Sequence, residues 1–188
     1  MSFTVLGTGS KLPDTVVTND DLATFLDTSD EWITTRTGIH RRHVLKQEKL
    51  IDLATVAAKN ALKNSGVTAD ELDLILCSTI QGDYVSPAFA CVVQKELGAT
   101  CPAFDVNAGC SGFIYALDVA DGYFARGRAK KVLIIAAEAM TRFTNWQDRS
   151  TCVLFGDGCG AVVLGEGDDL LSIKITAEGN FEALNIPH

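Results

Sequence analysis

Two strongly apolar runs, residues 72–79 and 131–137, constrain the fold of this chain more than any other feature. Each run has the length of a strand and carries apolar residues at successive positions, so both faces of the strand must be buried. Helical patterns at residues 50–64, 87–97 and 110–126 alternate with these runs. A buried strand followed by a helix and another strand is typical of a layered α/β domain with a parallel part in its sheet.

Shorter elements are predicted around this centre. Thr28 has a glutamate three residues later, which is the pattern of a capping box, so a helical turn is expected to begin there. Strands are expected at residues 3–7, 101–106, 151–155, 160–165 and 171–177, and helical turns at 20–26 and 68–71. A chain of 188 residues has the length of one domain. We therefore predict one α/β domain over residues 1–188, with helices packed on a layered mixed β-sheet.

The charge and the composition argue against several classes of protein. The formal net charge is −8, whereas a surface that binds nucleic acid needs a basic face. An acidic carrier protein would need a local basic patch to dock against this average charge. The first ten residues lack a signal-peptide pattern, and no apolar run is long enough to span a membrane. These features predict a cytoplasmic protein with neither a nucleic-acid nor a membrane partner.

The six cysteines do not form a metal-binding pattern. No C-x-x-C pair is present, so a zinc ribbon and a thioredoxin-like motif have little support. Most of the cysteines lie in apolar strand or helix patterns, where a free cysteine acts as a small hydrophobic residue. We expect no metal site, and free thiols suit a reducing compartment.

Cys110 differs from the other cysteines because it lies in a turn of small residues within the stretch DVNAGCSGF. In one interpretation it continues an apolar helix face with Phe113 and Leu117 and is a core residue. In the other it lies at the first turn of the helix, where unpaired N–H groups and the helix macrodipole favour a thiolate. Its small neighbours would then leave room for an acyl group. The residues alone leave both interpretations open.

Three segments carry a resemblance to a known family: DTSDEWITTRTGIHRRH at 27–43, CPAFDVNAGCSGFIYAL at 101–117 and FGDGCGAVVL at 155–164. In this order they resemble β-ketoacyl-acyl-carrier-protein synthase III, a condensing enzyme of the thiolase superfamily. The resemblance runs along essentially the whole chain and implies a thiolase-like fold. It makes Cys110 the nucleophile that accepts a short acyl group from coenzyme A, which is a substrate and not a permanently bound cofactor. The acyl-enzyme would then condense with malonyl-acyl-carrier protein and lose carbon dioxide.

The resemblance also implies a site for the nucleotide end of coenzyme A. Trp32 would stack on the adenine, Thr28 would line the same site, and Arg36 with Thr37 and Arg149 would complete it. Arginine suits phosphate because its planar fork presents paired donors. Without the resemblance, Thr28 is explained by helix capping, Trp32 by packing, and the two arginines by solvation at the surface.

Two other features attract attention without predicting a site. The stretch FGDGCGAVVLG superficially suggests a phosphate-binding loop, but it leads into a strand pattern and lacks the Gly-Lys-Ser/Thr ending. We interpret it as a turn packed close to the active-site backbone. The basic turn from His40 to His43 includes Arg41 and Arg42, and its side chains are expected to be solvated.

The resemblance further implies an internal duplication, in which a second half supplies a catalytic histidine and asparagine and most of the carrier-protein docking patch. The last residue, His188, does not match that histidine motif. We therefore expect residues 1–188 to be an N-terminal thiolase-like domain whose C-terminal half is absent, and to be incompetent alone for full condensation. Two alternatives stay open: a non-catalytic module that pairs with the missing half or forms a homo-oligomer, and a related acyltransferase with another ketoacyl product.

Overall fold

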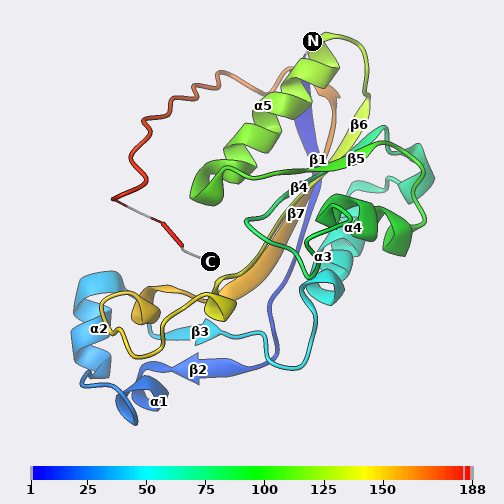
Figure 1. Cartoon of the computed structure of the whole chain (residues 1–188). Coiled ribbons are helices and arrows are strands. Elements are labelled where there is room, and N and C mark those ends of the chain that lie inside the picture. The colour runs from blue at the N-terminus through cyan, green and yellow to red at the C-terminus, as the bar shows by residue number, and fades with distance from the viewer. Residues whose placement is uncertain (1, 184, 187–188) are drawn as a thin grey trace.

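The predicted buried strands form the centre of a five-stranded sheet in the computed structural model, which describes residues 2–183, 185 and 186 (Figure 1). Across the sheet the strands are β1 (Ser2–Lys11), β7 (Asp157–Gly167), β6 (Lys131–Ala139), β4 (Leu74–Ser78) and β5 (Ala103–Val106). Strand β4 runs parallel to β5 and β6, whereas β7 is antiparallel to β6 and to β1. The prediction of a mixed sheet is therefore confirmed. His188 lies outside the described residues.

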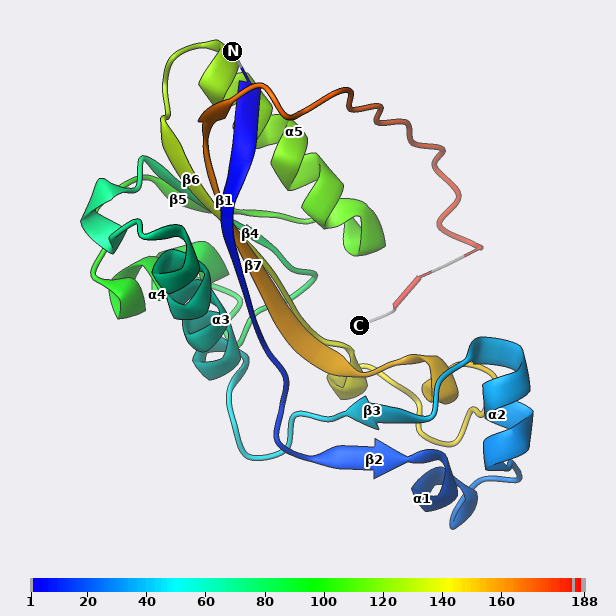
Figure 2. The same cartoon turned by 180° about the vertical axis from the view of Figure 1, so that it is seen from behind.

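Helices cover both faces of this sheet (Figures 1 and 2). The helices α3 (Leu50–Ser65) and α4 (Phe89–Leu97) pack with one set of sheet side chains, and α5 (Gly112–Ala125) packs with the other. As predicted, α3 and α4 end at glycines: Gly66 and Gly98 both have a φ of 72°, which residues with a side chain rarely adopt. No helix among the described residues has both the length and the apolar content needed to cross a bilayer.

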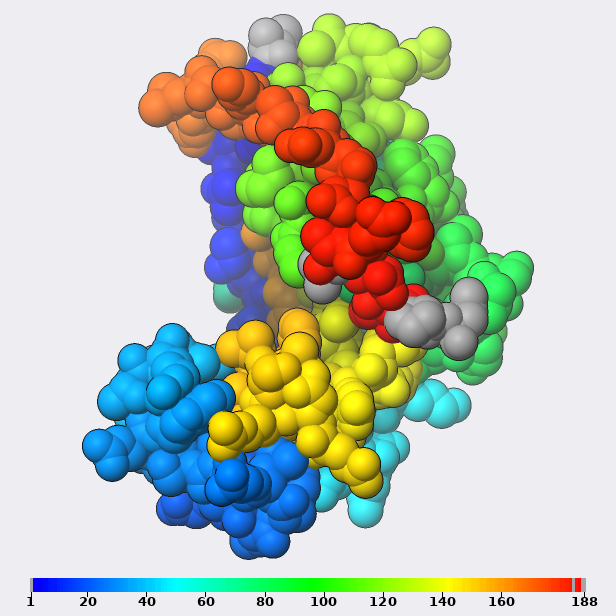
Figure 3. All heavy atoms as spheres, turned by 60° about the vertical axis from the view of Figure 1, so that its left-hand side comes forward, coloured from blue at the N-terminus to red at the C-terminus, as the bar shows by residue number. Residues whose placement is uncertain are grey.

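A second group of elements, here called the small lobe, lies beside one end of the sheet. It consists of β2 (Val16–Thr18), β3 (Arg41–His43), α1 (Asn19–Ala23), α2 (Asp30–Thr37) and the short 3₁₀ turn η4 (Cys152–Leu154). Its core is formed by four buried side chains, Leu22, Ile33, Cys152 and Val153. Figure 3 shows the blue and yellow segments of the small lobe packed together at the lower end of the molecule.

Two predicted strands are wrong. Residues 151–155 contain the turn η4, because the N–H groups of Thr151 and Cys152 both donate to the carbonyl of Asp148 at 3.2 and 3.0 Å. These local bonds coil the backbone, and its apolar side chains enter the core of the small lobe instead of a sheet. Residues 171–177 alternate polar and apolar side chains, but no described strand pairs with them and Leu171 is 96% exposed.

Candidate active site

Cys110 lies at the edge of the sheet where the parallel strands β4 and β5 end. The chain leaves β5 at Val106 and forms a 3₁₀ turn over Gly109–Ser111, and α5 begins only at Gly112. The sequence predicted that Cys110 lies in the first turn of the α-helix. It lies instead in the 3₁₀ turn just before the helix. Gly109 has a φ of 52°, which allows the chain to reverse so tightly. The Cys110 side chain is exposed, which matches the interpretation of a thiol placed for access.

The turn is attached to neighbouring elements on both sides. The amide of Asn107 donates to the Ile80 carbonyl at 3.3 Å, which joins the turn to the chain that leaves β4. Just before it, the carboxylate of Asp105 accepts from the N–H groups of Phe89 and Ala90, both at 2.7 Å, at the start of α4. These contacts fix the position of the turn relative to α4 and to the chain that leaves β4.

Four of the other five cysteines are poorer candidates for a nucleophile. Cys77 and Cys159 are buried, and burial raises the pKa of the Cys159 thiol to about 12 and that of Cys77 well above its ordinary value. Burial also raises the pKa values of Cys101 and Cys152. Because the thiolate is the reactive form of cysteine, these buried thiols are inert at neutral pH.

Glu138, near the end of β6, is a candidate group that the sequence analysis missed. Its Oε1 accepts from the N–H of Ile80 at 2.8 Å, and its buried Oε2 has no partner among the described residues. Since the Ile80 carbonyl accepts from Asn107, Glu138 is connected through Ile80 to the turn that carries Cys110. Burial raises the pKa of Glu138 to about 7. An acid inside the apolar run LIIAAEA was the available signal.

The raised pKa of Glu138 predicts a pH-dependent stability. Because its pKa in the folded chain exceeds the ordinary glutamate value of 4.5, folding favours the protonated form. This contribution is present below about pH 4.5 and is lost as the pH rises through about 7. Glu138→Gln stays neutral at every pH. The difference in free energy of unfolding between this variant and the unmodified chain should therefore grow in favour of the variant by about 1 to 2 kcal/mol between acidic and mildly alkaline pH, after allowance for solvent screening.

Urea denaturation of both proteins across this pH range measures the effect. Glu96→Gln at an exposed position of α4 is the matched control and should leave the pH dependence of unfolding unchanged. A constant difference between Glu138→Gln and the unmodified chain at every pH would contradict the prediction.

The start of α2 differs from the predicted capping box. Ser29, and not Thr28, is the N-cap, and its hydroxyl accepts from the N–H of Trp32 at 3.1 Å. The prediction of a capping box that starts at Thr28 is therefore wrong: the N-cap lies one residue later, and the helix starts at Asp30. The hydroxyl of Thr28 is buried and has no partner among the described residues.

Both predicted arginines, Arg36 and Arg149, lie beside Trp32. The guanidinium carbon of Arg36, one turn further along α2, lies 4.4 Å from the centre of the Trp32 ring. That of Arg149, in the turn before η4, lies 5.0 Å from the same centre. Arg149 also donates to the carbonyl of Asp27 and pairs with its carboxylate at 3.5 Å. This cluster offers an aromatic face for a planar base and guanidinium donors for phosphate.

Thr37 has a structural role within α2. Its hydroxyl donates to the Ile33 carbonyl at 2.8 Å and accepts from the N–H of Ile39 at 3.0 Å. These bonds satisfy the hydroxyl at the helix end, beside Gly38 in its left-handed conformation. The structure thus brings Trp32, Arg36 and Arg149 together and leaves Thr37 engaged elsewhere.

The glycine-rich stretch after η4 packs against the small lobe. As predicted, it leads into a strand, β7, and not into a helix. The close approach is to β3: a Cβ added to Gly156 would lie 3.0 Å from the Cβ of Arg42 and 3.2 Å from the His43 carbonyl oxygen. Asp157 then accepts from the N–H groups of Leu45 and Thr141 at 2.7 and 2.9 Å, which ties the strand to both neighbouring loops.

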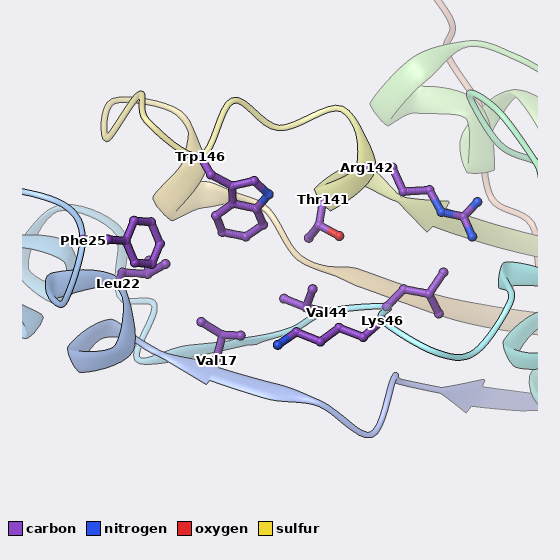
Figure 4. Close-up of a pocket in the computed structure, with 9 residues that line it drawn as sticks. Val17, Leu22, Phe25, Val44, Lys46, Thr141, Arg142 and Trp146 are labelled. Carbon is purple, nitrogen blue, oxygen red and sulfur yellow. The ribbon is translucent and has the colours of Figure 1, made fainter.

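A cavity of about 380 Å³ opens between α1, β3 and the loop after β6 (Figure 4). Its lining is mostly apolar, with basic side chains from Lys46 and Arg142. Arg142 is already paired with Asp83 at 2.8 Å. None of the predicted site residues lines this cavity.

Comparisons with known proteins show what this chain is similar to. The family described as 3-Oxoacyl-[acyl-carrier-protein (ACP)] synthase III matches residues 104–179, which include the Cys110 turn. A β-ketoacyl-[acyl-carrier-protein] synthase III of Xanthomonas campestris is 51% identical over 184 residues, which cover 96% of this chain and 57% of the relative.

Solved structures show the same relationship. The crystal structure of 3-oxoacyl-[acyl-carrier-protein] synthase III from Aquifex aeolicus VF5 matches with a TM-score of 0.86 and 51% identity, over 89% of this chain and 55% of that one. The priming β-ketosynthase of the R1128 polyketide biosynthetic pathway matches with a TM-score of 0.85 and 38% identity, over 89% and 51%. The chain thus spans little more than half the length of these relatives and has their thiolase-like fold. It belongs to the 3-oxoacyl-[acyl-carrier-protein] synthase III family.

Proposed function

We propose that this chain accepts an acyl group from an acyl-coenzyme A onto Cys110, the first half of the reaction of a 3-oxoacyl-acyl-carrier-protein synthase III. The observation that carries the proposal is the exposed thiol of Cys110 on a fixed turn where parallel strands end. Ligands of open α/β sheets bind at this edge. In the reaction, the Cys110 sulfur forms a thioester with the acyl carbonyl, and the bond to the coenzyme sulfur breaks. The proton of the Cys110 thiol leaves with the coenzyme thiol.

We place the nucleotide end of the coenzyme at Trp32, Arg36 and Arg149. Two guanidinium groups within 5.0 Å of the Trp32 ring centre form a local cationic site on a chain with a net charge of −8. Stacking on the ring suits adenine, and the guanidinium donors suit the phosphates. The unpartnered hydroxyl of Thr28 would donate to the same ligand. The coenzyme is then a substrate that leaves after each transfer.

We further propose that condensation with malonyl-acyl-carrier protein depends on groups outside these 188 residues. Enolate stabilisation needs a donor close to the acylated thiol. His43 lies on β3 of the small lobe, where its Nδ1 contacts the Pro13 carbonyl oxygen at 2.6 Å, and His40 directly precedes this strand. His188 lies outside the described residues. The six free thiols fit a reducing compartment, so we place the protein in the cytoplasm.

The test is the mass of the intact chain after incubation with acetyl-coenzyme A, followed by peptide mapping. The proposal expects one acetyl group on Cys110, released by hydroxylamine as a thioester is. No acetyl adduct on Cys110 would contradict the proposal.

A second candidate function, pairing without catalysis, is favoured by the apolar surface of α5. Ile114 on this helix is 45% exposed, and Phe113 and Leu117 are only partly buried. A helix with apolar residues around most of its circumference is normally buried by a neighbour. The face would suit a second copy of the chain or another domain of the same fold.

Self-association measured by analytical ultracentrifugation tests this function. Ile114→Glu should weaken association by about tenfold or more if α5 forms the contact, because the charge would have to be buried. Lys59→Glu on the exposed side of α3 is a control that should not weaken it. Association without acylation would favour pairing over acyl transfer, and a monomeric chain would contradict homotypic pairing.

A further inference from the structure

Arg42 is buried in the small lobe and pairs with no carboxylate in the described part of the chain. Its side chain, expected to be solvated as part of a basic turn, is only 5% exposed, so that expectation is wrong. The guanidinium donates to three neutral oxygens: Asn19 Oδ1 at 2.8 Å, the Val153 carbonyl at 3.2 Å and the Val17 carbonyl at 3.3 Å. A buried cation is costly unless its hydrogen bonds are made, and a buried ion is a weak source of stability. These contacts instead join three segments of the small lobe and fix their relative positions.

Asn19 extends this contact toward α2. It is 1% exposed, and its amide nitrogen donates to Asp30 Oδ1 at 2.8 Å and to the Ile39 carbonyl at 2.7 Å. Asp30 is the first residue of α2, two positions before Trp32. Asn19 therefore holds both ends of the helix that carries Trp32 and Arg36.

Arg42 also donates a hydrogen bond to the segment that follows Arg149. Its acceptor Val153 lies in η4, and the N–H of the preceding Cys152 donates to the Asp148 carbonyl at 3.0 Å. Arg149 follows Asp148 within this hydrogen-bonded turn. One guanidinium thus connects the two segments, far apart in sequence, that meet at the Trp32 ring.

We propose that Arg42 and Asn19 are positioning residues: they hold α2 and the turn before η4 at the separation that places Arg36 and Arg149 beside Trp32. The proposal rests on the assignment of that cluster as the nucleotide site. The cations over the ring are Arg36 and Arg149 and not Arg42. Among the described residues, the hydrogen bonds of Arg42 and Asn19 do not include the Cys110 turn, which is also distant from them in sequence. Their loss should therefore weaken recognition of the nucleotide and leave the chemistry at the thiol unchanged.

Arg42→Lys is the informative variant, because it keeps the charge and loses the planar fork that reaches three oxygens. Its matched control is Arg41→Lys, an exposed position on the same strand. Acylation is measured with acetyl-coenzyme A and with acetyl-N-acetylcysteamine, a thioester that has no nucleotide. Arg42→Lys should slow acylation by acetyl-coenzyme A about tenfold at subsaturating donor and change the rate with the truncated donor less than about twofold.

Equal slowing with both donors would overturn the proposal, since general destabilisation affects both reactions. Unchanged rates with both donors would overturn it as well. If Arg42→Lys does not fold by circular dichroism, Asn19→Ser removes the same connection from its other end and is judged by the same ratio.

A second measurement separates this proposal from the proposed acyl transfer. If the unmodified chain accepts no acyl group from either donor, the acyl-transfer proposal fails, and titration calorimetry with adenosine 3′,5′-bisphosphate decides the positioning role. Weaker binding by Arg42→Lys than by Arg41→Lys supports it. Equal binding by the two variants, or no binding by the unmodified chain, overturns it.

Discussion

Replacing Cys110 with alanine will abolish transfer of an acetyl group from acetyl-coenzyme A to this chain. Cys110 is the exposed cysteine, whereas burial raises the pKa values of four other cysteines and keeps them protonated. Loss of a covalent nucleophile removes the chemical step itself, so the rate should fall by at least about 10³-fold. The measurement is the intact mass of the chain over time with excess acetyl-coenzyme A.

Cys91→Ala provides the control for this prediction. Cys91 is partly buried, and its thiol contacts the Ala103 carbonyl oxygen at 3.5 Å on β5, a few residues before the Cys110 turn. This variant should accept one acetyl group at nearly the normal rate. An adduct on Cys110→Ala, or loss of the adduct in Cys91→Ala, would show that another thiol is the acceptor.

The central strands and the helix ends were predictable because their signals are local and strong. An uninterrupted apolar run such as LILCS in β4 has to be buried on both faces, and all five of its residues are. Gly66 and Gly98 end their helices through a backbone conformation that glycine adopts at no cost. The run at residues 151–155, which contains η4, misled the prediction because its N–H groups bond to Asp148, and apolar content alone does not reveal such local bonds.

The candidate site was predicted mainly through the family resemblance. The small neighbours of Cys110 left two interpretations open, and Trp32, Arg36 and Arg149 were assigned only because the resemblance implied them. Arg42 and Glu138 were missed for different reasons. Arg42 is buried by segments distant in sequence, and no local pattern distinguishes it from a solvated charge. Glu138 lies inside the apolar run LIIAAEA, and this signal was not used.

Gly9→Ala will destabilise the whole domain. Gly9 on β1 faces a surface of α3 formed by small residues, and this lets the helix backbone approach the strand closely. A Cβ at position 9 would overlap the Ala57 carbonyl oxygen and the Ala61 amide nitrogen, and would lie 2.8 Å from the Asn60 Cβ. Two of these atoms belong to the helix backbone, so α3 would have to move away from the sheet as a unit. Overpacking at such a contact should cost about 3 kcal/mol and lower the Tm by roughly 6 to 12 °C.

Gly160→Ala is the matched control, because Gly160 lies on the neighbouring strand β7 and pairs with Ser10, the residue after Gly9. A Cβ added there would have no atom within 4 Å, and alanine costs less backbone entropy in a strand than glycine. Its Tm should equal or exceed that of the unmodified chain in differential scanning calorimetry.

The contact between Gly9 and α3 matters for the site because α3 begins at Leu50, whose N–H donates at 3.2 Å to Asp83 in the loop after β4. That loop includes Ile80, which accepts from Asn107 at the start of the Cys110 turn, so displacement of α3 would loosen the turn before the domain unfolds. Equal Tm values for the two alanine variants would show that α3 adjusts to the added methyl group and that the small-residue contact does not limit the fold.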